Sequence, residues 1–85
     1  MNRVQLSAAA WNTPEKAHAD LAQALNFPEY YGHNLDALHD CLTDIGAPTR
    51  LILTGTEAPV AQRFLPILRD AAKQNRYLSL EVHRE

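Results

Sequence analysis

Three aspartates recur at a four-residue spacing near the middle of the chain, at Asp36, Asp40 and Asp44. Residues at this spacing stack on one face of a helix, so the three carboxylates would form a stripe of negative charge. Like charges so placed destabilise a helix by roughly 0.2–0.5 kcal/mol per pair. A departure of this kind from what folding alone favours is typical of a functional site, although an ordinary solvated face remains the alternative. A row of carboxylates suits a partner whose Arg and Lys side chains normally hold phosphates.

The region around these aspartates lacks the strongly basic residues Lys and Arg. Between Lys16 and Arg50 the chain has no Lys or Arg, so the formal net charge of −2 conceals a strongly acidic middle segment. Acidic surfaces repel phosphates and attract basic proteins. We therefore expect a basic protein partner and no direct binding to nucleic acid.

Length and composition predict one small domain over residues 1–85. We expect no cofactor. The chain is 46% apolar, which is typical of a globular protein, and it contains a single cysteine, Cys41. One cysteine cannot form an intramolecular bridge, so a reducing cytoplasm is the expected location. The N-terminus lacks the apolar stretch of a signal peptide, and no run approaches the roughly 20 residues of a membrane span. We expect the free protein to be a monomer.

Capping residues and apolar spacing predict three helices. Thr13 precedes Pro14 as an expected N-cap, and Phe27-Pro28 is the expected end of that first helix. Asn34 is expected to cap a second helix over residues 35–45. A third helix is expected to begin near Thr56 and Pro59, and Pro66 is expected to kink or break it near Gln62.

Three short apolar segments predict strands around these helices. Val4 and Leu6 alternate with polar residues, the segment 51–53 is continuously apolar, and the segment 77–82 alternates again. The resulting order is β-α-α-β-α-β, in which strands separated by helices pair in parallel. The predicted fold class is therefore α/β.

The segment from Phe27 to Thr43 carries a longer and more specific pattern. It contains Tyr-Tyr-Gly-x-Asn-Leu-Asp-Ala-Leu followed by x-Asp-Cys-Leu-Thr, and it resembles the signature of the barstar family. The resemblance implies a single barstar-like domain with a small three-stranded parallel sheet packed against three to four helices. It also implies a cytoplasmic inhibitor that plugs the active site of a ribonuclease such as barnase, acting as an antitoxin or immunity protein. The second helix and the loop before it would enter the cleft that normally holds RNA phosphates.

Carried over by motif position, the resemblance implies a set of partner-binding residues, with Asp40 as the central anchor. An acidic contact on the last helix is approximately matched by a further aspartate. The residues implied in this way are Tyr30, Asp36, Asp40, Thr43 and Asp70.

The chain departs from the family pattern at the edge of this expected footprint. His39 stands where the family has a large aromatic residue, Asp44-Ile45 replaces a glycine–aromatic pair, and Gln74 replaces an acidic residue. We expect His39 and Asp44 to contact the partner as well. These changes favour a cognate enzyme other than barnase.

Other reactive residues have simpler explanations. One of Tyr30 and Tyr31 is expected in the core and the other, Tyr30, at the interface. His33 and His39 have poor spacing for a metal site, and Cys41 lacks a nearby base, so it is interpreted as a buried structural residue. The alternative functions are an interaction module that neutralises a different toxin or binds another basic protein, and a hydrolase with paired carboxylates. The hydrolase lacks a complete catalytic set, so the chain is not expected to be an enzyme.

Overall fold

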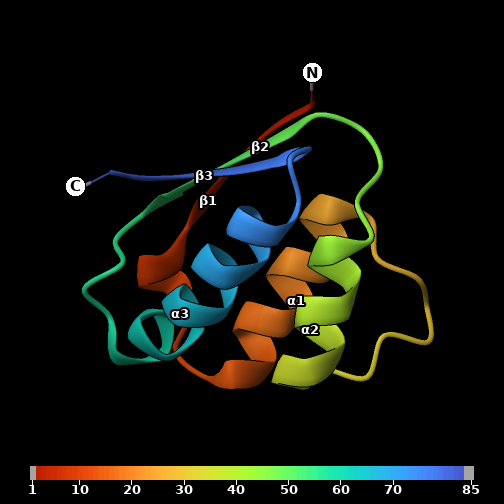
Figure 1. Cartoon of the computed structure of the whole chain (residues 1–85). Helices are drawn as coiled ribbons and strands as arrows, with labels where there is room; N and C mark the ends of the chain where they lie inside the picture. Colours follow the sequence, from red (N-terminus) through yellow and green to blue (C-terminus); the bar gives the residue numbers. More distant parts are fainter. Residues whose placement is uncertain (1, 84–85) are drawn as a thin grey trace.

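Three α-helices cover one face of a three-stranded parallel sheet (Figure 1). This arrangement comes from a computed structural model that describes residues 2–83. The chain begins with strand β1 and continues through the short 3₁₀ helix η1 into the remaining helices and strands. The elements are β1 (Asn2–Ser7), η1 (Ala8–Ala10), α1 (Pro14–Leu25), α2 (Leu35–Thr43), β2 (Thr49–Thr54), α3 (Pro59–Gln74) and β3 (Leu78–His83). The predicted order of strands and helices and the α/β class are confirmed.

Strand β2 lies at the centre of the sheet, between β1 and β3, and both pairings are parallel. Val4 on β1 is level with Leu51 on β2, which is level with Leu80 on β3. Parallel neighbours require long connections, and here α1 and α2 form the first crossover and α3 forms the second. Leu51 and Leu53 on β2 are almost completely buried, as expected for the continuous apolar run.

The first two helices begin where their capping residues predict. The Thr13 hydroxyl accepts a hydrogen bond from the Lys16 backbone N–H at 3.2 Å, and the Asn34 side-chain oxygen accepts one from Ala37 at 2.8 Å. The end of α1 differs from the prediction by two residues. Asn26 adopts a left-handed conformation with φ of 57° and ends the helix before Phe27-Pro28 is reached. Asparagine tolerates this conformation well, which makes it a common C-terminal cap.

Helix α3 runs without a break through Pro66, so the predicted break does not occur. Proline removes one intrahelical hydrogen bond, here the bond to the Gln62 carbonyl. Both Pro66 and Gln62 are exposed, and water can therefore satisfy that carbonyl. Phe64 and Leu68 are buried on either side of the proline and hold the two halves against the same core. The helix begins at Pro59, within the predicted region, and its N-cap residue is Ala58.

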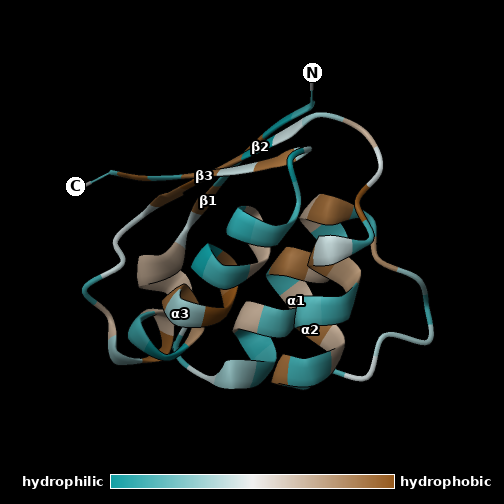
Figure 2. Ribbon diagram, in the orientation of Figure 1, coloured by the Kyte–Doolittle hydropathy of each residue, from teal (hydrophilic) through white to brown (hydrophobic). Residues whose placement is uncertain are grey.

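The core lies between the sheet and the helices. Trp11 is buried there, and its indole N–H donates to Asp20 at 3.0 Å. Each helix carries both hydrophilic and hydrophobic residues (Figure 2). Within residues 2–83, none of the helices combines the length and the apolar character that crossing a bilayer requires. The fully buried leucines are Leu21, Leu38, Leu42, Leu51, Leu53 and Leu68.

Gly55 is expected to be the glycine at which a side chain is least tolerated. It has φ of 65°, and an added Cβ would lie 2.6 Å from the Ala9 Cβ and 2.8 Å from the Ala9 backbone nitrogen. The left-handed conformation and the overlap each cost about 1–2 kcal/mol, so Gly55→Ala should lower the free energy of unfolding by about 2–4 kcal/mol. Urea denaturation measures this loss.

Gly46→Ala is the matched control for this prediction, because a Cβ at Gly46 meets no atom within 4 Å. Its free energy of unfolding should stay within about 0.5 kcal/mol of the parent value. Equal stability of the two alanine variants would contradict the proposed overlap with Ala9.

Candidate protein interface

The structure places the three aspartates on one exposed face, formed by α2 and its C-cap residue. Asp36, Asp40 and Asp44 are all exposed, and their carboxylates form no ion pair or side-chain hydrogen bond with any residue from 2 to 83. The opposite face of the helix buries Leu38 and Leu42 completely. We call Asp36, Asp40 and Asp44 the acidic face; its charge is directed to water, and no Lys, Arg or His among residues 2–83 forms an ion pair with it.

Helix α2 is shorter than the predicted 35–45 and ends at Thr43. Asp44 is the C-cap residue and keeps a right-handed helical conformation, with φ of −87° and ψ of −8°, so it continues the acidic face. Asp36 lies in the first turn, where the helix dipole favours negative charge, whereas Asp44 lies where the dipole disfavours it. The acidic face therefore forms although its carboxylates repel one another and the helix dipole disfavours the charge of Asp44.

A buried amide on another element holds the C-terminal end of α2. The side-chain nitrogen of Asn75 donates to the carbonyls of Leu42 at 3.0 Å and Ile45 at 2.9 Å, with a longer contact to Thr43 at 3.4 Å. Its side-chain oxygen accepts from the Tyr77 backbone N–H at 3.0 Å. Helix ends leave carbonyls without partners, and Asn75 supplies these partners from the end of α3. Nothing local in the sequence indicates this role, because the carbonyls lie about thirty positions away.

A second buried polar link holds the loop that precedes α2. The Tyr31 hydroxyl lies 2.6 Å from Nδ1 of His18 on α1, and both side chains are buried. Burial lowers the pKa of His18, and the electrostatic interaction with His33 adds to this effect, whereas Glu15 opposes it. Burial also raises the pKa of Tyr31 to about 12, with a smaller contribution from Cys41. Both shifts favour a neutral pair in which the Tyr31 hydroxyl donates to His18.

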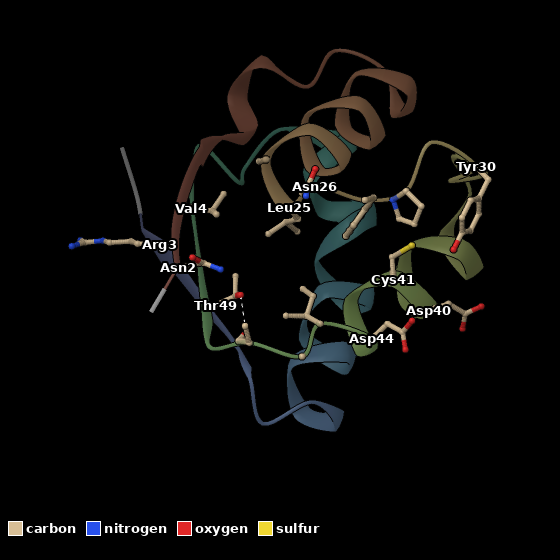
Figure 3. Close-up of a pocket in the computed structure, with 16 residues that line it drawn as sticks. Asn2, Arg3, Val4, Leu25, Asn26, Tyr30, Asp40, Cys41, Asp44 and Thr49 are labelled. Atoms are coloured by element: carbon tan, nitrogen blue, oxygen red, sulfur yellow. Dashed lines mark hydrogen bonds between the residues drawn. The ribbon is translucent and has the colours of Figure 1, made fainter.

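The two adjacent tyrosines of this loop have opposite environments, as the sequence predicts. Tyr31 is 7% exposed, whereas Tyr30 is 87% exposed. Figure 3 shows the Tyr30 hydroxyl directed toward the part of α2 that carries Cys41 and Asp40. The structure therefore places a large accessible aromatic ring beside the acidic face.

The side of α2 that faces α3 is occupied by an internal pair. His39 Nε2 lies 2.8 Å from Asp70 Oδ2, and the Gln74 side-chain amide donates to the same oxygen at 2.9 Å. Two predicted partner-binding residues, His39 and Asp70, thus contact each other across the two helices. The Thr43 hydroxyl is also engaged, because it donates to the backbone carbonyls of His39 and Asp40 at 2.9 Å and 3.1 Å.

The sequence predicts a buried Cys41, but the side chain is only half-buried. It lies on the side of α2 away from α3, where a surface groove prevents complete coverage. Burial raises the pKa of its thiol, and the negative charges of Asp40 and Asp44 raise it further, which makes the thiol a poor nucleophile. Across the described residues, no three His, Cys, Asp or Glu side chains are grouped so that they could hold a metal ion.

Most of this chain is similar in sequence to known proteins. A family model described as "Barstar (barnase inhibitor)" matches residues 1–82. A protein of Bacillus subtilis (strain 168), named "Putative ribonuclease inhibitor YrdF", is 41% identical over 58 residues. The aligned segment covers 67% of this chain and 64% of the relative, so the match spans a little less than two thirds of that protein's length.

Loss of the Asn75 amide is expected to destabilise the protein and loosen the end of α2. Asn75→Ala would leave buried carbonyls unsatisfied and should lower the free energy of unfolding by about 1–3 kcal/mol. Asn75→Asp keeps the shape but faces the same carbonyls with an acceptor, so its loss should be at least as large. Lys73→Ala, on the exposed last turn of α3, is the control and should change stability by less than about 0.5 kcal/mol. If urea denaturation gives Asn75→Ala the same free energy of unfolding as Lys73→Ala, the proposed role of the amide is wrong.

The His18–Tyr31 link predicts that stability falls in mild acid. In the folded state the pKa of His18 lies below the ordinary histidine value of 6.5, so below pH 6.5 the unfolded state takes up more protons. The free energy of unfolding should therefore decrease as pH falls from 6.5 toward the lowered folded-state pKa. Each pH unit by which the pKa is lowered contributes about 1.4 kcal/mol. NMR titration of the imidazole in the native protein should give a midpoint below 6.5, and a midpoint above 6.5 would reverse the expected slope.

Proposed function

Because the chain belongs to the barstar family, we propose that it is a cytoplasmic inhibitor of a ribonuclease, acting as an antitoxin or immunity protein. The family match over residues 1–82 and the ribonuclease-inhibitor name of the Bacillus subtilis relative support this class of function. The lone half-buried cysteine fits a reducing compartment.

The observation that carries the proposal is the acidic face, which forms no ion pair with any residue from 2 to 83. In this proposal Asp36 and Asp40 enter the ribonuclease active site and occupy the positions of substrate phosphates, with Asp40 at the centre. They lie on successive turns of a helix, about 6 Å apart along its axis. Arginine and lysine side chains that hold phosphate can form charge-assisted hydrogen bonds to these carboxylates. The bound helix would then exclude RNA sterically.

The charge distribution supports fast association with a basic enzyme. No Lys or Arg lies between positions 16 and 50, so no permanently charged cation in this segment opposes the field of the acidic face. Complementary fields raise association rates, and added salt screens them. The rate at which the chain associates with the enzyme is therefore expected to decline as ionic strength rises.

The fixation of α2 at both ends supports tight binding. Asn75 holds one end through three carbonyls, and the Tyr31–His18 hydrogen bond holds the loop before the other end. A binding element already held in place loses little conformational freedom on association. Inhibition by an ordered convex helix requires no catalytic group, and we propose that the chain binds without performing a reaction.

A second candidate is a protein-interaction module that neutralises a non-ribonuclease toxin or binds another basic protein. The observation that favours it is the internal His39–Asp70 pair, which occupies part of the expected contact surface next to α3. Stable binding to a basic partner without any effect on RNA cleavage would select this candidate.

Replacement of the central aspartate tests the proposed inhibition. Asp40→Ala should weaken binding by about 2–5 kcal/mol, because cations in the enzyme's active site would be left buried and unpaired. The measurements are the dissociation constant and the residual RNA cleavage, with barnase and the product of the neighbouring open reading frame as the two test proteins.

Glu57→Gln is the matched control, because it removes a negative charge from the exposed connection between β2 and α3, away from α2 (Figure 1). It should change affinity by less than about 0.5 kcal/mol. A loss of that small size for Asp40→Ala would exclude Asp40 as the anchor.

A further inference from the structure

A groove of about 690 Å³ opens beside α2, on the side away from α3. Its walls come from the beginning of β1, the end of α1, the loop after α1 and the segment that joins α2 to β2 (Figure 3). The floor is apolar, and its side chains are partly buried against the core. The floor residues are Val4, Leu25, Phe27 and Ile45.

The rim of the groove beside α2 is acidic. Asp40 and Asp44 both line the groove, and Tyr30 lines it from the loop. Neither carboxylate has an ionic partner within residues 2–83. The basic residue of the lining, Arg3, lies at the far end with its guanidinium directed away (Figure 3). The groove thus combines an apolar floor with two unneutralised carboxylates at one rim.

The apolar floor and the acidic rim together favour a ligand that is both apolar and positively charged. An arginine side chain has an apolar stem and a charged head, so the stem can lie along apolar surface while the head meets carboxylates. An anion would be repelled at the rim, and a purely apolar segment would leave Asp40 and Asp44 unpaired.

We propose, on the basis of the inhibitor function above, that this groove receives an arginine-bearing apolar segment of the ribonuclease. The guanidinium pairs with Asp40 and Asp44, and the neighbouring apolar side chains contact Phe27 and Ile45. The interface then extends from the acidic face across the groove toward β1. In this arrangement Asp40 pairs with cations of the active site and with the inserted guanidinium, whereas Asp44 pairs with the inserted guanidinium alone.

Small residues keep the groove open. A Cβ at Gly46 would meet no atom within 4 Å, and Ala47 and Ala24 contribute only methyl groups to the lining. Larger side chains at these positions would compete with the occupant for the same space. Substitutions at these small residues can therefore block the groove without altering the acidic face.

The test fills the groove from α1. Ala24→Phe should weaken binding at least about tenfold to whichever of barnase and the neighbouring gene product the wild-type chain inhibits. Ala19→Phe is the matched control, because Ala19 is exposed on the same helix and borders a different hollow. Its affinity should stay within about twofold of the wild-type value. Ala47→Trp fills the groove from the opposite wall and replaces Ala24→Phe if that variant fails to fold in a urea titration.

The outcomes separate this proposal from the function on which it rests. If the wild-type chain inhibits a ribonuclease and both groove-filling variants bind as it does, the groove proposal is wrong and the inhibitor function stands. If the wild-type chain binds neither test protein, both are wrong. A concentration-dependent dimer that Ala24→Phe abolishes would assign the groove to a second copy of the chain and would also overturn the proposal.

The charge preference of the groove can be read from Cys41, which lines it. A cationic methanethiosulfonate reagent should modify this thiol at least about tenfold faster than an anionic one at low salt. Asp44→Asn should reduce the ratio, and Ala24→Phe should slow both reagents. Equal rates for the two reagents in the wild-type chain would contradict a cation-selective groove.

Discussion

The contact between the Asn75 side-chain amide and the end of α2 is the interaction on which the acidic face depends most. A nine-residue helix is too short to be stable by itself, and this one also carries like charges on successive turns. Its persistence therefore depends on tertiary contacts. Asn75 satisfies the carbonyls that α2 leaves open and binds Tyr77, the residue before β3, with its other end. One buried amide thus fixes the acidic helix to both α3 and the sheet.

The other face of α2 explains how unfavourable charge is tolerated. Leu38 and Leu42 are fully buried, and burial of a leucine contributes roughly 1.5–3 kcal/mol. The repulsion within the acidic face is several-fold smaller per pair. Because the two terms lie on opposite faces of the same helix, the core can hold the carboxylates in position without neutralising them. The side chains that stabilise the helix and the exposed carboxylates therefore occupy opposite faces of the same nine-residue helix.

The sequence predicted the features that depend on neighbours a few residues apart. The caps Thr13 and Asn34, the stripe of aspartates and the order of strands all follow from local spacing, and the structure contains them. Contacts between distant segments were not predictable in this way. Asn75 binds carbonyls about thirty residues earlier, and His39 pairs with Asp70 across two helices. The half-buried state of Cys41 depends on a groove formed by four separate segments, and no local pattern encodes that arrangement.

Two departures from the family pattern, His39 on α2 and Asp44 at its C-cap, have opposite consequences. His39 faces α3, and its pair with Asp70 and Gln74 leaves that side internally satisfied. Asp44 faces the groove and has no ionic partner among residues 2–83. Unsatisfied charge therefore extends from Asp40 toward β1 and not toward α3. A ribonuclease matched to this chain is expected to carry its additional positive charge on the side of β1, because a cation placed beside α3 would compete with an imidazole for a carboxylate that already accepts two hydrogen bonds.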